Sequence, residues 1–373
     1  MKVVIAIDSF KGSLSSIEAG KAASEGIKRV FPDSEALIKP VADGGEGTTE
    51  TLVLGLNGRF REVNVSDPLG RKIIAKYGIL PDNTAVIEMA AASGLTLLSE
   101  CERHPMLTTT YGTGEMIIDA IENGCHNFII GIGGSATNDG GIGCLQALGF
   151  GMLDKNGQQL GYGAEGLSHL VQITSDNVIP ELRECTFHVA CDVTNPLCGK
   201  NGCSAVFAPQ KRADEEMIRK MDDYLHNYAK LAKQYNPAAD PDTAGGLGFA
   251  LMYFLNARLE SGIDLIIRET KLEEAIKSVD IVITGEGCLD GQTAMGKAPV
   301  DIAAIAKKYN KPVIAFCGSV GNGAKFCNDN GIDAYFPKLH KISTSEQAME
   351  RKNAYNNLVD TVEQVFRVIR LLY

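Results

Sequence analysis

Residues 279–299 read VDIVITGEGCLDGQTAMGKAP, which places a strand pattern, a glycine-rich loop and a helix start in immediate succession. The first part, 279–284, is a β-branched run with one charge, which predicts a buried strand. Three glycines between 285 and 291 then predict that the chain leaves the strand as a loop. Apolar residues at helical spacing predict a helix over 298–309. Strand, glycine loop, lysine and helix start together are the usual geometry of a phosphate site.

The glycine and lysine spacing within this stretch is that of a Walker A loop, running from Gly291 to Lys297. Ala298, however, stands where a Ser or Thr would hold Mg²⁺ in a Walker A loop. A metal ion would therefore need other oxygen ligands, and Glu286 and Asp290 are the nearest candidates. The alternative is an ordinary strand-to-helix turn whose glycines serve only the backbone geometry.

Size and composition limit the classes of protein that this chain can belong to. With 373 residues the chain is too long for one typical core, so two domains are expected. A net charge of −10 and the lack of a basic stripe argue against nucleic-acid binding. No apolar run approaches the length of a membrane span, and the ten cysteines contain no Cys-x-x-Cys pair. We expect a cytoplasmic protein with reduced thiols that binds neither nucleic acid nor membrane.

The two ends of the chain share a pattern that the middle lacks. Strand and helix patterns alternate over about 1–58 and again over 278–373, which is typical of an open parallel sheet. The segment 59–277 instead begins with alternating strands joined by turn signals, which predict antiparallel pairing. The simplest organisation is an α/β domain built from 1–58 plus 278–373, with a mixed α/β domain, 59–277, inserted in it.

Polar, glycine-rich loops follow several of the predicted strands, at the sheet edge where ligands bind in open α/β folds. The first loop, 8–13, offers Asp8, Ser9 and Lys11 to an anion, and Ser15 with Glu18 predicts a capping box for the next helix. The loop 42–49 contains three glycines and two acids, which suits a phosphate or a metal ion, or only a tight turn.

The third loop, 131–141, fits the dinucleotide fingerprint Gly-x-Gly-x-x-Ala, with Asp154 near the expected distance for a ribose contact. An NAD-dependent oxidoreductase is therefore the rival interpretation. The loop is more polar and longer than that turn requires, and the sequence offers no evident proton donor for hydride transfer.

Two further segments contain groups that could hold a small acid. Asp192 and Asn195 follow a predicted strand and could serve as a base or as a substrate anchor. Lys211 and Arg212 are adjacent cations in an acidic chain and would suit a carboxylate, although a solvated surface pair is the commoner case. So many glycine loops exceed the need of one dinucleotide but suit a kinase, which mainly positions a triphosphate, Mg²⁺ and a small substrate.

The motifs as a set resemble those of the type-1 glycerate kinase family and occur in the family's order over nearly the whole chain. They are DSFKGS (8–13), ADGGEGT (42–48), GIGGSATNDGG (131–141), CDVTNPL (191–197), FAPQK (207–211), GGLG (245–248), TGEG (284–287), DGQT (290–293) and GKAP (296–299). The resemblance implies Mg²⁺-dependent transfer of the ATP γ-phosphate to the 2-hydroxyl of D-glycerate. It also implies a discontinuous Rossmann-like domain with an inserted domain and an active site in the cleft between them.

The predicted site residues fall into four sets by role. The catalytic candidates are Lys11, Asp192, Asp290 and Lys297, with either aspartate orienting or deprotonating the 2-hydroxyl. The candidates for substrate and phosphate binding are Asp8, Ser9, Lys11, Ser135, Asn138, Asp139, Asn195, Lys211, Arg212 and Gln292. The candidates for nucleotide binding are Gly44, Gly45, Gly133, Gly134, Gly285, Gly287, Gly296 and Lys297, and those for Mg²⁺ are Asp43, Glu46 and Glu286.

Two residues depart from the family pattern. Arg212 stands where the family usually has Gly, and Cys288 stands where an Arg is common. If that Arg normally binds an anion, Arg212 or Lys297 must take over its role. The protein is expected to be a monomer or a homodimer. A non-catalytic sugar-acid sensor is the third interpretation of its function, although the sequence shows no evident output module such as a helix-turn-helix.

Overall fold

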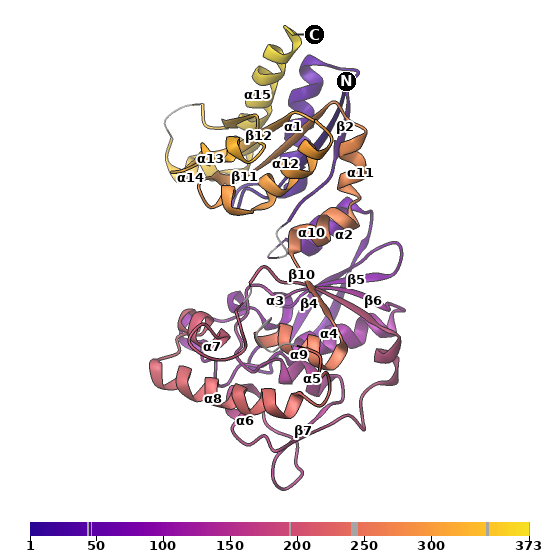
Figure 1. The fold of residues 1–373 in the computed structure, drawn as a ribbon, viewed down its shortest axis with the longest axis vertical. Helices are drawn as coiled ribbons and strands as arrows, with labels where there is room; N and C mark the ends of the chain where they lie inside the picture. Colours follow the sequence, from indigo (N-terminus) through magenta and orange to yellow (C-terminus); the bar gives the residue numbers. More distant parts are fainter. Residues whose placement is uncertain (43–44, 46, 194, 240–244, 341–342, 373) are drawn as a thin grey trace. The chain divides into compact units, whose positions relative to one another are not determined.

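The computed structural model describes residues 1–42, 45, 47–193, 195–239, 245–340 and 343–372 (Figure 1). The chain divides into two compact units. Unit 1 comprises Met1–Asp43, Glu50–Leu56 and Ile263–Tyr373, and unit 2 comprises Gly44–Thr49 and Asn57–Gly262. Both units combine helices with sheets, so the protein has a two-unit α/β fold.

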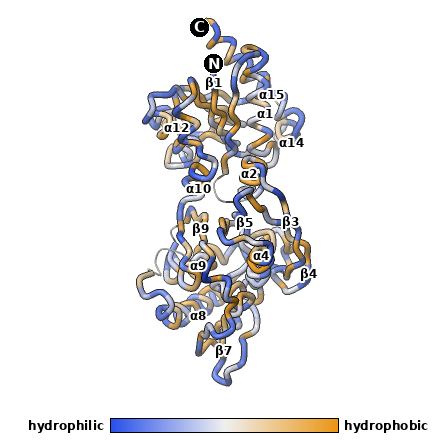
Figure 2. The backbone as a smooth tube through the Cα atoms, turned by 90° about the vertical axis from the view of Figure 1, so that its right-hand side faces the viewer, coloured by the Kyte–Doolittle hydropathy of each residue, from blue (hydrophilic) through white to orange (hydrophobic). Residues whose placement is uncertain are grey.

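The described residues of unit 1 form a five-stranded sheet in the order β13-β12-β11-β1-β2, with every pairing parallel. Its strands are β1 (Lys2–Ile7), β2 (Glu35–Ile38), β11 (Ile281–Leu289), β12 (Val313–Val320) and β13 (Ala334–Pro337). After its first residue β1 is entirely buried and hydrophobic (Figure 2), as expected for a parallel strand covered on both faces. The apolar run at 3–7 predicts such a strand, and β1 confirms it.

Two helices from opposite ends of the chain cover one face of this sheet. α1 (Ser16–Val30) packs against α15 (Arg351–Arg370), and together with β1 and β11 they enclose the core of unit 1. The predicted capping box is confirmed, because the Glu18 amide donates to Ser15 Oγ at 3.3 Å and the Ser15 amide donates to Glu18 Oε2 at 2.9 Å. The other helical segments that belong wholly or mostly to unit 1 are α2 (Thr48–Gly55), α10 (Gly262–Glu269), α11 (Leu272–Lys277), η5 (Thr293–Met295), α12 (Ala298–Lys308), α13 (Phe326–Asp329) and α14 (Ser345–Met349).

The glycines at 285 and 287 lie inside a strand, and the prediction that they begin a loop was wrong. β11 continues to Leu289 and pairs with β12 as far as Val320. A β-carbon at Gly285 would lie 1.9 Å from the Phe316 carbonyl oxygen, and one at Gly318 would lie 2.4 Å from the Gly287 carbonyl oxygen. The glycines therefore permit a close approach of two strand backbones, and the loop begins only after Leu289.

Other predicted boundaries also differ from the observed ones. The sequence pattern of 345–371 predicts one helix, whereas the structure has two, since Glu350 between α14 and α15 has a non-helical ψ of 123°. The sequence pattern also predicts a helix near 321–330, of which only α13 forms. Residues 263–277, which fall within the predicted inserted domain 59–277, form most of α10 and all of α11 and group with unit 1.

Unit 2 is built on a mixed sheet, which its described residues form from six strands in the order β10-β9-β6-β5-β4-β3. The strands are β3 (Arg59–Ser66), β4 (Lys72–Ile79), β5 (Thr84–Glu88), β6 (Asn127–Gly131), β9 (Thr186–Ala190) and β10 (Arg258–Glu260). β3, β4 and β5 pair antiparallel, as the turn signals predicted, whereas β5, β6, β9 and β10 pair parallel. A separate two-stranded sheet pairs β7 (Gly151–Leu153) with β8 (Gln172–Thr174) in antiparallel orientation.

The helical segments of unit 2 enclose its large hydrophobic core with the sheet. They are α3 (Ala90–Ser93), η1 (Leu95–Leu97), η2 (Glu100–Glu102), α4 (Tyr111–Glu122), α5 (Ile142–Ala147), α6 (Gly163–Leu167), η3 (Pro180–Glu184), α7 (Cys203–Phe207), η4 (Pro209–Lys211), α8 (Glu215–Ala232) and α9 (Gly246–Leu255). The charged amphipathic pattern of 214–236 predicts one long helix, which α8 confirms, although α8 ends earlier, at Ala232. In the described part of the chain, no helix combines the length and the apolar character needed to cross a membrane.

Replacing Gly285 with Ala is expected to destabilise unit 1 by about 2 kcal/mol or more, because the new methyl group has no space against β12. Gly161→Ala is the matched control, since no atom lies within 4 Å of a β-carbon there. Urea unfolding of both variants measures the effect. Equal stability of the two variants would contradict the close approach of β11 and β12.

Candidate functional site

The first group of predicted residues lies at the carboxyl edge of the unit 1 sheet. Asp8 follows β1 directly, and its amide donates to the Gly285 carbonyl oxygen of β11 at 2.9 Å. The Ser9 amide donates to the Asp8 carboxylate at 2.6 Å. A β-carbon at Gly287 would lie 3.6 Å from the Lys11 backbone nitrogen, so the loop after β1 runs against β11. Pairing of β1 with β11 therefore joins residues from the two ends of the chain.

Lys297 connects the two acidic residues of this edge. Its Nζ lies 3.9 Å from Glu286 Oε2 and 3.9 Å from Asp290 Oδ1. Glu286 is contributed by β11, Asp290 follows the end of that strand, and Lys297 directly precedes α12, whose second residue is Pro299. Two carboxylates, one ammonium group and a helix N-terminus thus meet at the end of β11 and in the segment that follows it. The sequence pattern places Glu286 in the same loop as Asp290, whereas Glu286 is a strand residue.

Thr293 holds the two carboxylates in position. Its hydroxyl donates to Glu286 Oε1 at 2.5 Å, and the Asp290 amide donates to the same hydroxyl at 3.0 Å. The Thr293 amide returns a hydrogen bond to Asp290 Oδ1 at 3.1 Å. This residue was not among the predicted site residues, although the reciprocal spacing Asp-x-x-Thr resembles a helix cap and could have identified it.

The two carboxyl groups differ in their electrostatic environment. Burial raises the pKa of Glu286, an effect that Thr293 and the nearby Lys297 and Lys11 partly oppose. The pKa of Asp290 is lowered, chiefly by the hydrogen bond from the Thr293 backbone and then by that from Gln292. Asp290 is therefore held as a carboxylate, which suits an acceptor or a metal ligand better than a strong base.

The oxygen atoms of Glu286 and Asp290 are the kind of ligand that Mg²⁺ prefers. Each carboxylate has an oxygen 3.9 Å from Lys297 Nζ, and each is hydrogen-bonded to Thr293. Among the described residues no group of three His, Cys, Asp or Glu side chains could hold a metal ion. The predicted ligands Asp43 and Glu46, and the predicted nucleotide contact Gly44, lie outside the described residues.

The remaining predicted site residues of unit 1 differ in how they could contact a ligand. Gly296 has a φ of 108°, and no atom lies within 4 Å of a β-carbon there. The backbone before α12 is therefore open to a ligand. Gln292 is exposed, and its amide donates to Asp290 Oδ1 at 2.8 Å. Gly285 and Gly287 are strand residues, so any contact with a nucleotide would be made by their backbone.

A second group of predicted residues lies at the carboxyl edge of the unit 2 sheet, where β5, β6 and β9 end side by side. A β-carbon at Gly133, after β6, would lie 3.5 Å from the Gly45 Cα atom. The Thr49 amide donates to the Glu88 carboxylate at the end of β5, at 2.7 Å. Two glycine loops that are distant in sequence are thus neighbours here.

Asp139 is buried beneath the loop that follows β6. Its carboxylate accepts hydrogen bonds from the Thr110 amide at 2.8 Å, the Thr110 hydroxyl at 2.9 Å, and the Gly141 and Gly143 amides at 3.0 and 3.2 Å. Burial raises the pKa of Asp139, and these donors oppose the rise. Asp139 therefore holds the loop in shape, and its predicted contact with substrate stays a prediction.

Lys211 is also buried, against the same loop. Its Nζ donates to the Thr137 carbonyl oxygen at 2.5 Å, and burial lowers the pKa of Lys211 to about 8. Asn138 Nδ2 donates to Ser204 Oγ at 2.8 Å, and the Ser135 hydroxyl accepts from the Thr137 amide at 3.0 Å. The loop is therefore polar and tightly bonded. Gly134 in the same loop has a φ of 72°.

The other predicted residues of unit 2 are more exposed. Asp192 accepts a hydrogen bond from the Gly262 amide at 2.9 Å, and Asn195 Nδ2 donates to the Asn201 carbonyl oxygen at 2.9 Å. Arg212 has a left-handed φ of 67°, which explains why glycine would be favoured at its position. Its guanidinium donates to the Glu100 carbonyl oxygen at 2.9 Å.

The geometry after β6 does not match a dinucleotide site. Helix α5 begins only at Ile142, so no helix N-terminus follows the glycines directly. Asp154, the expected ribose contact, instead accepts hydrogen bonds from the Asn156 and Gln158 amides of its own turn. The oxidoreductase interpretation thus lacks both elements that it requires.

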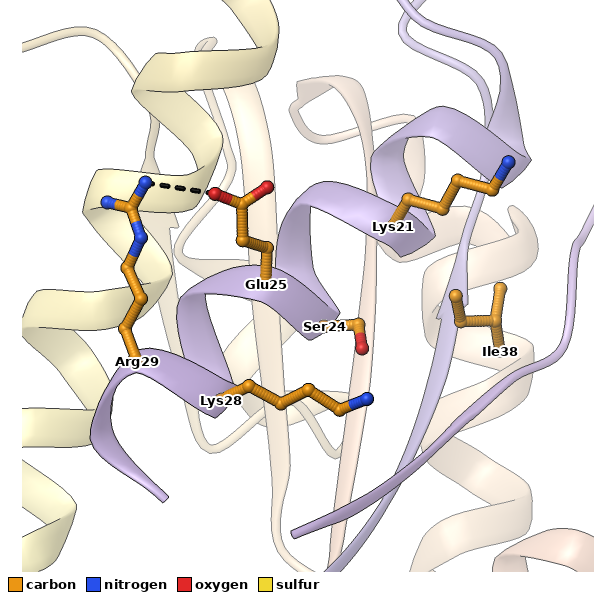
Figure 3. Close-up of a pocket in the computed structure, with 6 residues that line it drawn as sticks. All are labelled: Lys21, Ser24, Glu25, Lys28, Arg29 and Ile38. Carbon is orange, nitrogen blue, oxygen red and sulfur yellow. Dashed lines mark hydrogen bonds and ion pairs between the residues drawn. The ribbon is translucent and has the colours of Figure 1, made fainter. Parts of the chain in front are cut away.

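A surface pocket beside α1 contains none of the predicted site residues (Figure 3). It is lined by Lys21, Ser24, Glu25, Lys28, Arg29 and Ile38. Glu25 and Arg29 form an ion pair at 2.9 Å within it. Its cations are exposed and partly neutralised, so it is not part of the candidate site.

Comparisons with known proteins bear on the whole chain. The model of the Glycerate kinase family matches residues 3–370. Glycerate 2-kinase of Escherichia coli (strain K12) is 47% identical over 364 residues, which are 96% of this chain and 95% of that protein. Glycerate kinase of Bacillus subtilis (strain 168) is 45% identical over 361 residues, 95% of this chain and 94% of that protein.

A solved structure agrees with these relatives. The crystal structure of a proposed glycerate kinase 2 from Salmonella typhimurium LT2 is 44% identical, has a TM-score of 0.91, and covers 100% of this chain and 98% of its own. The fold is thus that of an enzyme of the kinase class. The chain is a member of the glycerate kinase family, as its motifs indicated.

Lys338 is a second residue that the sequence analysis missed, and it generates a prediction of pH dependence. It is 3% exposed, its Nζ has no hydrogen-bond partner among the described residues, and it lies 4.6 Å from the centroid of the Phe10 ring. Burial lowers the pKa of Lys338 from 10.5 to about 8. No local sequence signal marks it, since only the tertiary fold buries it.

Replacing Lys338 with Met is expected to stabilise the protein below pH 8, because the native state then no longer buries an unpaired ammonium. Between pH 8 and about 10.4 the unfolded chain binds more protons than the native state. Wild-type stability therefore rises with pH in this window, and the advantage of Lys338→Met shrinks.

Free energies of unfolding in urea at pH 7 and pH 9.5 measure this difference. Lys325→Met, at an exposed lysine of the same unit, is the matched control. An advantage of Lys338→Met that is equal at both pH values would show that the ammonium is not penalised in the native state.

Proposed function

We propose that this protein transfers the γ-phosphate of ATP to the 2-hydroxyl of D-glycerate, giving 2-phospho-D-glycerate and ADP. The observation that carries the proposal is the placement of Lys297 between Glu286 and Asp290 at the start of α12. It supplies positive charge, a helix N-terminus and hard oxygen ligands, which are the parts that phosphoryl transfer requires. The position of the hydroxyl follows the name of the Escherichia coli relative, glycerate 2-kinase.

The proposed reaction is a direct in-line displacement. The 2-hydroxyl oxygen forms a bond to the γ-phosphorus as the bond from that phosphorus to the ADP oxygen breaks, and the hydroxyl proton is released. Lys11 and Lys297 would neutralise the equatorial oxygens of the transferring group. Because the pKa of Asp290 is lowered, it would serve as acceptor and ligand, and Asp192 is the remaining candidate to orient or deprotonate the 2-hydroxyl.

Mg²⁺ is the cofactor that we propose, held by Glu286 with Asp290 and, outside the described residues, by Asp43 or Glu46. When bound, it would neutralise charge on the phosphate oxygens of ATP. In unit 2, the loop with Gly133 and Gly134 would hold phosphate or the glycerate carboxylate through backbone amides. Lys211, whose Nζ donates to the Thr137 carbonyl oxygen of that loop, and Arg212 would add positive charge.

The discontinuous Rossmann-like domain with an active site in the cleft between two domains stays a prediction. So do the cytoplasmic location and the monomeric or homodimeric state. The parallel sheet built from both chain ends supports the first of these.

The test is ADP release with Mg²⁺-ATP and D-glycerate, with the phosphorylated carbon identified by ³¹P–¹H NMR. We expect glycerate-dependent ADP and a 2-phosphate product. EDTA should abolish turnover, and excess Mg²⁺ should restore it. A 3-phosphate product would contradict phosphorylation of the 2-hydroxyl. ADP release at the same rate with and without D-glycerate would contradict the proposed substrate.

Lys11→Ala is expected to lower kcat by about 10²-fold or more, because a charge facing the transferring phosphate is lost. The melting temperature should stay close to that of the wild type, since Lys11 is exposed. Lys21→Ala removes another exposed lysine, in α1, and should leave kcat unchanged. Wild-type turnover by a folded Lys11→Ala protein would rule out this role.

A further inference from the structure

Three large apolar side chains of unit 1 are exposed in segments next to the one that carries Asp290 and Lys297. Met295 in η5 is 86% exposed, Phe326 at the start of α13 is 57% exposed, and Val320 at the end of β12 is 42% exposed. Phe326 is the most exposed aromatic side chain in the described part of the chain. We call these three residues the apolar platform.

Hydrogen bonds join the platform's segments to the loop that holds Asp290 and Lys297. The Gly291 amide donates to the Asn322 carbonyl oxygen at 2.9 Å, and the Gly321 amide donates to the Leu289 carbonyl oxygen at 2.8 Å. Cys327 Sγ, next to Phe326, donates to the Asp290 carbonyl oxygen at 3.7 Å. α13 also packs against η5, which contains Met295. The segments that carry the platform residues are therefore hydrogen-bonded to, or packed against, the segment that carries Asp290.

Single exposed apolar residues need no explanation, whereas a group of them beside polar binding residues is typical of a ligand site. Of the reactants that the proposed function requires, D-glycerate is small and polar throughout, and the triphosphate is charged. The purine base is the one part with flat apolar faces. Stacking of a base on an exposed aromatic ring contributes about 1–3 kcal/mol to binding. Binding of the base would also remove the exposed Phe326 ring from water.

We propose that Phe326, with Met295 and Val320, forms the surface on which the adenine base of ATP stacks while the phosphates face Lys297. This inference rests on the proposed function, because it takes ATP as the nucleotide. It assigns the base to unit 1, at the β12–α13 connection.

The absence of tryptophan from the sequence makes a direct test possible, since Phe326→Trp introduces a single fluorophore. ADP titrated into this variant should quench or shift the emission, because the base stacks on the indole. Phe60→Trp places the same probe at an exposed position of unit 2, where Phe60 is 36% exposed, and should not respond.

Phe326→Ala should weaken ADP binding about tenfold, as loss of one stacked ring predicts. It should raise KM for ATP by a similar factor, leave KM for D-glycerate unchanged, and leave the affinity for inorganic tripolyphosphate unchanged. Phe60→Ala is the matched control for each measurement. Sedimentation of Phe326→Ala and wild type reports whether a second copy of the chain covers the platform instead.

The outcomes separate this inference from the proposed function. Wild-type protein that binds no ADP would overturn both. ADP binding that Phe326→Ala leaves intact would overturn the platform alone, as would an equal loss of ADP and tripolyphosphate affinity, which would mean that the ring supports the phosphate loop. A change in oligomeric state without a change in ADP affinity would assign the platform to self-association and overturn the adenine contact.

Discussion

The parallel pairing of β1 with β11 is the constraint on which unit 1 depends. The Lys2 amide donates to the Asp280 carboxylate at 2.8 Å across a sequence separation of 278 residues, and the Asp280 amide donates to the Lys2 carbonyl oxygen at 2.9 Å. Asp280, the one charge in an otherwise apolar strand pattern, thus fixes the start of the register. From there the register carries Ile7 to Gly285, which brings the loop after β1 beside β11.

Groups around the end of β11 offset the free-energy cost of burying charge at this site. Glu286 is 9% exposed, and an isolated buried carboxylate would be strongly disfavoured as an anion. The Thr293 hydroxyl and the Lys297 ammonium compensate it, and Asp290 is stabilised by backbone amides. A cluster of this kind keeps its charges in place before a ligand arrives, so little reorganisation is needed when phosphate binds.

In unit 2, buried charged groups fix the conformation of the loop after β6. Glycines alone would leave this loop with many accessible backbone conformations, since glycine has the most backbone freedom. Two buried charged groups hold it instead: Lys211 donates to the Thr137 carbonyl oxygen, and the Asp139 carboxylate accepts from the amides of Gly141 and Thr110. The polar residues that looked like ligand contacts in sequence are therefore partly the internal scaffold of the loop, and Arg212 is turned to a backbone carbonyl of η2.

Sequence alone determined what local chemistry dictates. The capping box at Ser15, the apolar strand β1, the antiparallel meander from β3 to β5 and the grouping of Glu286, Asp290 and Lys297 all follow from short-range spacing. The long motifs also identified the family. Tertiary structure decided what depends on distant neighbours: Gly285 and Gly287 belong to a strand because Phe316 and Gly318 approach them closely. It likewise decided that Lys338 is buried without a hydrogen-bond partner among the described residues, and that Asp139 is satisfied by Thr110. Burial and close backbone contact are properties of residues that meet only after folding, so no local pattern can encode them.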